Sequence, residues 1–258
     1  MLQLYIMNLV QTLILSVVEG ITEFLPISST GHLILVSDFL KITQTEFVKS
    51  FEIIIQLGAI LSVVVIYFKK LIKNIDLWKQ ITVAFLPSAI FGVLFYKLIK
   101  TYLIGNSLVV VLSLFIGGIV MILFEKYHKD KEKELNLKHY LLIGLFQVVS
   151  MIPGVSRAFA TIFGGMVVGM SRKKATEFSF FLAIPTMLGA TFLDLIKTDV
   201  SVWTNSNFVT LLIGFLASFI TAYIVIRWLI KFVQTHNFVG FGWYRIVLGI
   251  IYLLFVIR

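Results

Sequence analysis

Residues 19–32 read E-G-I-T-E-F-L-P-I-S-S-T-G-H, and they lie inside a longer, mostly apolar stretch that covers residues 4–36. The segment carries two carboxylates, several hydroxyls and an imidazole. In the hydrocarbon core of a bilayer an ionised side chain costs on the order of 3 kcal/mol, so residues of this kind are expected to serve a function there. We therefore expect the functional site to be built around this segment.

Composition places the chain among integral membrane proteins. Of its 258 residues 59% are hydrophobic and 14% are charged, and the mean hydropathy is +1.00, whereas soluble domains are about 45–50% apolar. The net charge is +9, but the basic residues lie in short segments between apolar runs, as membrane topology requires. We therefore expect membrane lipid, and no nucleic acid, as a partner. The lack of cysteine excludes disulfides and thiolate chemistry.

Six apolar runs are long enough, at about 20 residues, to cross a bilayer as helices. Two further apolar regions, 4–36 and 140–170, are each too long for one span and are broken by a proline next to small polar residues. We expect both to form re-entrant helical hairpins, because non-helical backbone at membrane depth is tolerated only where protein or a watery cavity satisfies it. The predicted spans are 51–68, 77–96, 108–124, 176–196, 208–230 and 238–257.

The expected fold is an all-α polytopic membrane protein with a single domain, residues 1–258. Repeat one covers about 1–124, a charged linker covers 125–139, and repeat two covers 140–258. Each repeat contains one re-entrant hairpin and three spanning helices. This odd number inverts the second repeat relative to the first, an architecture in which binding sites form at the midplane where broken helices meet.

The distribution of basic residues predicts the orientation. When the first basic loop is placed in the cytoplasm, 14 Lys and Arg residues fall on that side and six on the other, while Arg157 and Arg245 stay at membrane depth. The positive-inside rule then places the linker 125–139 in the cytoplasm and both termini outside. The charged segment 125–134 is expected to be a solvated loop. The N-terminal segment lacks the features of a cleavable signal peptide, so we expect it to remain in the mature protein.

The first hairpin carries the main candidate residues. Glu19 and Glu23 are spaced i, i+4, so on a helix they share a face and can hold one divalent cation or one proton between them. Pro26 is expected to stop the first helix, and Ser28 or Ser29 to cap the next one. Such a helix start leaves backbone N–H groups facing the break, which makes it an anion site.

The second hairpin repeats this pattern. Pro153 breaks the chain, Ser156 is placed to cap a new helix, and Arg157 adds a bidentate phosphate donor at its start. A shift of 127 residues superposes Pro26 on Pro153 and Ser29 on Ser156, and little else. Together the carboxylates, the two helix starts, the arginine and the hydroxyls predict a phosphate or diphosphate site.

Several of these residues also have a plain structural interpretation. Ser28, Thr30 and Thr161 are candidates for substrate binding, but a hydroxyl in a membrane helix often bonds only its own backbone. His32 is either a catalytic histidine or a core histidine. Arg245 is expected to extend to the membrane interface or to pair with a carboxylate.

The sequence resembles the bacterial undecaprenyl-diphosphatases, also called bacitracin-resistance proteins, over essentially the whole chain. This resemblance implies removal of one phosphate from undecaprenyl diphosphate, a polyprenyl diphosphate lipid, which recycles the lipid carrier of cell-wall peptidoglycan synthesis. It also implies a divalent cation, Mg²⁺ or Ca²⁺, and a site open to the outer face of the bacterial plasma membrane. Besides 19–32, the resemblance rests on F-E-I-I-I-Q-L-G-A-I-L (51–61), P-G-V-S-R-A-F-A-T-I (153–162), G-G-M-V-V-G-M-S-R (164–172), E-F-S-F-F-L-A-I-P-T-M-L-G-A (177–190) and W-Y-R-I-V-L-G (243–249).

The resemblance also implies roles at matching positions. Glu19 and Glu23 would be the essential carboxylates and the metal ligands, and Arg157 the phosphate-binding arginine. Ser29 would be the hydroxyl nucleophile and His32 the family's histidine, although the residues alone do not choose between these two as nucleophile.

The chain departs from the family pattern at three positions. Ala158 and Phe159 stand where the family usually has Ser-Gly, and Phe163 stands where a serine is common. A competing function is a transporter or flippase of a polyprenyl phosphate or another anionic lipid, because inverted repeats with broken helices are a transporter architecture. The sequence is compatible with a homodimer and does not set the oligomeric state.

Overall fold

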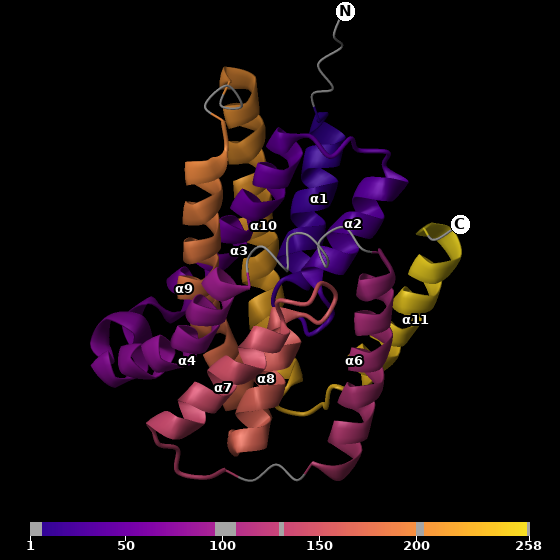
Figure 1. The fold of residues 1–258 in the computed structure, drawn as a ribbon. Helices are drawn as coiled ribbons and strands as arrows, with labels where there is room; N and C mark the ends of the chain where they lie inside the picture. The colour runs from indigo at the N-terminus through magenta and orange to yellow at the C-terminus, as the bar shows by residue number, and fades with distance from the viewer. Residues whose placement is uncertain (1–6, 96–106, 129–131, 200–203, 257–258) are drawn as a thin grey trace, which may run out of the picture.

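The computed structural model describes residues 7–95, 107–128, 132–199 and 204–256, and all regular secondary structure in these ranges is helical (Figure 1). The expected all-α class is therefore confirmed. The helices are α1 (Leu9–Thr22), α2 (Ser29–Phe39), α3 (Glu46–Lys73), α4 (Ile75–Leu94), α6 (Ser107–Tyr127), α7 (Leu137–Val149), α8 (Arg157–Val168), α9 (Arg172–Lys197), α10 (Asn205–Phe232) and α11 (Val239–Val256).

Five helices are long and apolar enough to cross a membrane: α3, α4, α6, α9 and α10. They correspond to five of the six predicted spans. The sixth predicted span, 238–257, is α11, which is also apolar but has only 18 residues. Helix α3 extends beyond its predicted span at both ends. The added turns carry Glu46 at the start and Lys70 and Lys73 at the end, and these charges interact favourably with the helix dipole.

Helix α1 packs on α2 and α7 packs on α8, so each short pair forms a hairpin, while their re-entrant insertion into the membrane stays a prediction. Figure 1 shows that α1 and α2 enter from the upper end of the molecule, whereas α7 and α8 enter from the lower end, and the turns of the two hairpins meet at mid-height. The two halves also exchange packing partners, since α1 and α3 pack on α10, while α7 and α9 pack on α4. The inverted relation between two complete repeats remains a prediction.

The break in the first hairpin comes earlier than predicted. Helix α1 ends at Thr22, four residues before Pro26. Glu23 is the C-cap and keeps a helical backbone, with φ −63° and ψ −41°, and its N–H donates to the carbonyl of Glu19. The two carboxylates therefore keep the i, i+4 relation, and Pro26 lies inside the turn that follows.

The two breaks end in the same local structure. Ser28 caps α2 and Ser156 caps α8, and each side-chain oxygen accepts from the N–H three residues later. Their φ angles are 73° and 76°, in a region that non-glycine residues rarely adopt. The matching serines are thus 128 residues apart, so the equivalence of Ser29 with Ser156 suggested by the sequence is off by one residue.

Close helix packing depends on small residues. A Cβ atom added at Gly58 in α3 would clash with the carbonyl of Phe215 in α10, and one at Gly144 in α7 would clash with the carbonyl of Ala84 in α4. Helices in membranes are held by such close backbone approach, because lipid tails provide no hydrophobic driving force between them. The first contact joins two long helices, and the second fixes the second hairpin against α4.

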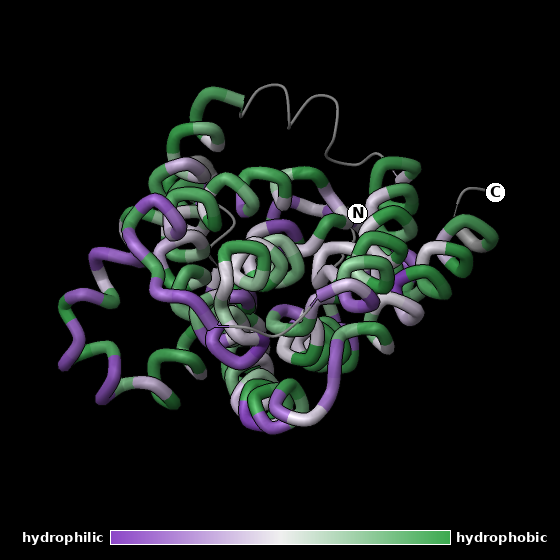
Figure 2. Tube along the Cα trace, turned by 90° about the horizontal axis from the view of Figure 1, so that it is seen from below, coloured by the Kyte–Doolittle hydropathy of each residue, from purple (hydrophilic) through white to green (hydrophobic). Residues whose placement is uncertain are grey.

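The outside of the bundle is apolar. Large hydrophobic side chains such as Val93 and Phe192 are 75% and 64% exposed. Figure 2, which views the molecule from below, shows hydrophobic stretches along the peripheral helices and hydrophilic stretches mainly in links between helices and near the centre. A surface of this kind suits lipid, as expected for a multi-pass membrane protein.

The start of the predicted linker is not a solvated loop. Glu125 lies in the last turns of α6 and is buried. It accepts from Nη2 of Arg172 at 2.6 Å and from the N–H of Phe238 at 3.0 Å. Glu125 therefore joins α6, α9 and the beginning of α11. The sequence did not reveal this, because a single inward-facing acid cannot be told apart from its solvated neighbours in a charged segment.

Candidate active site

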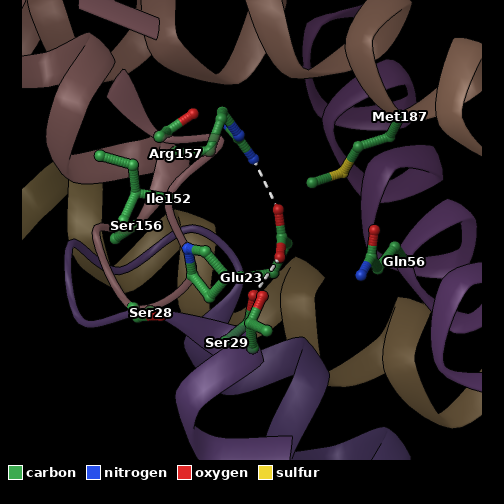
Figure 3. Close-up of a pocket in the computed structure, with 12 residues that line it drawn as sticks. Glu23, Ser28, Ser29, Gln56, Ile152, Ser156, Arg157 and Met187 are labelled. Carbon is green, nitrogen blue, oxygen red and sulfur yellow. Dashed lines mark hydrogen bonds and ion pairs between the residues drawn. The ribbon is translucent and has the colours of Figure 1, made fainter. Parts of the chain in front are cut away.

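A polar pocket of about 110 Å³ lies where the two hairpin breaks meet (Figure 3). The first hairpin contributes residues 23 and 28–30, the second contributes 150, 152–154 and 156–157, and the long helices α3 and α9 add Gln56 and Met187. We call this cavity the phosphate pocket. The sequence predicted both of its walls from the hairpins, but it did not single out Gln56 or Met187, although both fall inside quoted motifs.

Glu23 lies at the centre of a chain of short hydrogen bonds. Its Oε1 accepts from Nη2 of Arg157 at 2.7 Å, and its Oε2 accepts from Oγ of Ser29 at 2.6 Å. Figure 3 shows the arginine and the serine pointing at this carboxylate from opposite sides. The structure thus brings together an acid from α1, a hydroxyl from the start of α2 and a cation from the start of α8.

Arg157 is held on two sides and keeps one donor free. Nη1 donates to the carbonyl of Ser179 in α9 at 2.9 Å, while Nη2 is held by Glu23. Its buried Nε has no hydrogen-bond partner within the described chain. Because a guanidinium can only donate and a buried donor without a partner is costly, this N–H is suited to an incoming anion oxygen.

The helix starts add further donors. The first N–H groups of an α-helix have no partner within the helix and lie at the positive end of its dipole, so they favour phosphate. Ser29 and Thr30 open α2, and Arg157 opens α8. Both capping serines line the phosphate pocket. Two anion-binding helix starts therefore share one cavity.

Glu19 indicates whether the site suits a cation. Its carboxylate is 0% exposed, and neither oxygen has a hydrogen-bond partner among the residues described. A buried carboxylate without a partner is strongly destabilising, so it requires a proton or a cation, and Mg²⁺ and Ca²⁺ take oxygen ligands. The described ranges contain no group of three His, Cys, Asp or Glu residues that could hold a metal. A cation held by Glu19 and Glu23 would therefore complete its shell with water or substrate oxygens.

Three predicted site residues lie outside the pocket lining, namely Glu19, His32 and Thr161. Thr161 donates to the carbonyl of Arg157 at 2.8 Å, and its Oγ1 also lies 2.7 Å from Oγ of Ser179, so it supports the arginine from behind. In His32 Nδ1 lies 2.8 Å from the carbonyl of Ser28, and Nε2 lies 2.6 Å from the hydroxyl of Tyr244. Since a carbonyl only accepts, Nδ1 carries the proton and Nε2 accepts from the tyrosine.

The aromatic departures from the family pattern also lie away from the phosphates. Phe159 and Phe163 line a small apolar cavity on the other side of α8 and do not line the phosphate pocket. The ring of Phe163 packs against Phe124 and Phe146. These rings therefore fill space between α8, α6 and α7, and they leave the polar groups around Arg157 in place.

Comparison with known proteins decides the family. The profile described as Bacitracin resistance protein BacA matches residues 12–251. The chain belongs to this family. An undecaprenyl-diphosphatase of Aquifex aeolicus is 53% identical, over 95% of this chain and 97% of its own length. Undecaprenyl-diphosphatases of Sulfurihydrogenibium sp. and Persephonella marina are 50% and 48% identical, over 96% and 97% of this chain and 99% and 100% of their own lengths.

Proposed function

We propose that this protein hydrolyses undecaprenyl diphosphate to undecaprenyl phosphate and inorganic phosphate, and that the reaction takes place in the phosphate pocket. The observation that carries the proposal is the hydrogen-bonded row Arg157, Glu23 and Ser29, because it combines a cation, a base and a hydroxyl at two anion-binding helix starts. Full-length relatives named undecaprenyl-diphosphatase support the same reaction. Resistance to bacitracin is the property after which the family is named.

Ser29 is the proposed nucleophile. Its Oγ attacks the terminal phosphorus, and its proton passes to Oε2 of Glu23, which already accepts that hydroxyl at 2.6 Å. The bond between the terminal phosphorus and the bridging oxygen breaks, and undecaprenyl phosphate leaves with the electron pair. Water then hydrolyses the phosphoserine, which releases phosphate and restores the hydroxyl.

The remaining groups stabilise charge. Phosphoryl transfer depends above all on positioning and on neutralising the equatorial oxygens. The free Nε of Arg157 and the N–H groups at the starts of α2 and α8 are the donors for these oxygens. Ser28, Thr30 and Ser156 line the pocket and bind the same phosphates. A divalent cation, Mg²⁺ or Ca²⁺, held by Glu19 and Glu23 would supply further neutralisation of the diphosphate.

The proposed orientation places the pocket mouth toward the extracytoplasmic side, with both termini outside and the α6–α7 link in the cytoplasm. The excess of basic residues on the cytoplasmic side, 14 against six, supports this. In Figure 1 α6 ends and α7 begins at the lower end, whereas α1 begins and α11 ends in the upper part of the molecule.

Phosphate release by the purified protein in detergent tests the proposal. Wild-type protein should release phosphate from undecaprenyl diphosphate, and Glu23→Gln should release none, because the amide keeps the size but cannot take the proton. Glu46→Gln is the matched control, since Glu46 is exposed at the start of α3, and it should keep wild-type turnover. A protein that only moved the lipid across the membrane would release no phosphate at all.

A further inference from the structure

Arg245 in α11 is a fully buried cation held entirely by backbone carbonyls. It is 0% exposed. Nη1 donates to the carbonyl of Pro26 at 3.2 Å and to that of Val155 at 2.8 Å, and Nη2 donates to those of Gly154 and Ser113, each at 3.0 Å. The arginine was expected to reach the interface or to pair with a carboxylate, and it does neither. It connects the breaks of both hairpins to each other and to α6.

The charge of Arg245 is not cancelled by an acid. In the ranges that the structure describes, no carboxylate forms an ion pair with it. Carbonyl dipoles solvate the guanidinium in its plane, and the ring of Phe159 lies 5.0 Å from its central carbon. Burying a charge without a counter-ion is costly. We therefore infer that the positive charge of Arg245 serves a function at its position next to the two breaks.

The hydrogen bond to Val155 also fixes the direction of the next amide. A trans peptide unit is planar, and its C=O and N–H point in opposite directions. Because the carbonyl of Val155 points at Arg245, the N–H of Ser156 points away from it. Ser156 lines the phosphate pocket and has the disfavoured φ of 76°. Arg245 thus holds a strained turn that would relax without it.

We propose that Arg245 is a positioning residue of the phosphate pocket. It ties the two breaks into one anion site, turns the N–H of Ser156 toward the diphosphate and adds a positive charge behind it. This rests on the proposed function. The residue does not touch the substrate; it acts through the backbone of Pro26, Gly154 and Val155.

Three variants test this role. Arg245→Lys keeps the charge but replaces the planar five-donor fork by one nitrogen, which cannot reach carbonyls of both breaks. Gly117→Ala leaves Arg245 in place, but its added Cβ would clash with Nη2 and press on the end of the guanidinium. Gly249→Ala is the control, because its Cβ would meet neighbours only at ordinary contact distance, 3.5 Å or more.

We expect Arg245→Lys to lower kcat/KM on the order of 100-fold, because the N–H of Ser156 would then be misplaced and a transition-state donor would be lost. Gly117→Ala should lower it about 10-fold, since small misplacements of binding groups are costly. Gly249→Ala should stay within about twofold of wild type, because it leaves the guanidinium undisturbed. Wild-type kcat/KM in both Arg245→Lys and Gly117→Ala would overturn the proposal, whereas absence of phosphate release by wild type would overturn the proposed function instead.

A binding measurement separates positioning from simple stabilisation. Substrate is added to Ser29→Ala, which is expected to bind it but to turn it over on the order of 10³-fold more slowly. The rise in unfolding temperature is compared with that of the double variant Ser29→Ala, Arg245→Lys. We expect the rise to be lost in the double variant even where the ligand-free proteins unfold at similar temperatures. A lower unfolding temperature with an unchanged rise would show that Arg245 only stabilises the fold, and the proposal would be wrong.

Discussion

Ser29 and His32 are the two residues that the sequence left open as nucleophile, and their surroundings differ. The hydroxyl of Ser29 already donates to Glu23, whereas both ring nitrogens of His32 are engaged, one by the carbonyl of Ser28 and the other by Tyr244. A ring nitrogen that accepts a hydrogen bond from a tyrosine has no free lone pair for attack on phosphorus.

We therefore predict that Ser29→Ala lowers turnover on the order of 10³-fold or more and abolishes a phosphoenzyme trapped by acid quench. His32→Ala should still form the phosphoenzyme, although more slowly, because it loses only the support of the α2 cap. If Ser29→Ala still forms the phosphoenzyme and His32→Ala does not, the histidine is the nucleophile.

Tyr244 gives a milder test of the same arrangement. Its hydroxyl fixes His32, which in turn holds the carbonyl of the capping residue Ser28. Tyr244→Phe removes this hydrogen bond and keeps the stacked ring, so we expect kcat to fall about 10-fold with little change in the unfolding temperature. Tyr252→Phe in the same helix is the control, because within the described ranges the hydroxyl of Tyr252 makes one long hydrogen bond, to Ser107 at 3.4 Å. If both changes lowered kcat equally, the hydrogen bond between Tyr244 and His32 would have no role in positioning the site.

Glu19 carries the prediction about the metal. Its buried oxygens have no partner within the described residues, so a cation that it holds should bind far more weakly to Glu19→Gln. We expect a chelator to stop phosphate release by wild type and added Mg²⁺ or Ca²⁺ to restore it, and Glu19→Gln to need at least about 10-fold more cation for half its own maximal rate. Full activity of chelated wild-type protein would show that the reaction needs no metal.

At the scale of elements, Glu125 clamps three helices through Arg172 and the N–H of Phe238. Breaking a buried ion pair by removing one partner costs about 3–5 kcal/mol, because the other charge stays buried. We predict that Glu125→Gln lowers the free energy of unfolding in detergent by about 3 kcal/mol, while turnover per folded molecule is kept because the clamp lies outside the phosphate pocket.

Asp76→Asn is the matched control for this clamp. Asp76 and Lys79 form an ion pair in which both side chains are largely exposed. Surface pairs contribute under about 1 kcal/mol, so this change should leave unfolding nearly as in wild type. A similar loss of stability in both variants would mean that burial at Glu125 does not matter.

The elements themselves could be predicted because apolar length and proline placement are local signals. The sequence predicted the two proline-broken helix pairs and five of the long spans. It could not place the end of α1 at Thr22, since the turn before Pro26 depends on contacts with the second hairpin. Nor could it give the carbonyl partners of Arg245 or the inward turn of Glu125, because backbone carbonyls leave no trace in residue identity and an acid at a helix end resembles a solvated one.

At the scale of the whole molecule, the two hairpins enter from opposite ends and meet at mid-height, so the phosphate pocket draws on both halves of the chain (Figure 1). Glu23 and the proposed nucleophile Ser29 come from the first half, and Arg157 comes from the second. Neither half would form the pocket alone. This division explains why the similarity between the halves is confined to the breaks: the pocket needs the same backbone turn twice but different side chains at each turn.

The orientation of this arrangement gives the last prediction. The link between α2 and α3 lies at the upper end of the molecule, whereas α6 ends and α7 begins at the lower end (Figure 1). The positive-inside rule places the upper end outside the cytoplasm. Because the chain contains no cysteine, single cysteines at the exposed positions Thr43 and Glu134 report on the two ends directly. An impermeant thiol reagent should label Thr43→Cys in intact spheroplasts and Glu134→Cys only after the membrane is opened. The reverse pattern would invert the orientation and place the pocket mouth on the cytoplasmic side, and labelling of both in spheroplasts would contradict the inverted repeat itself.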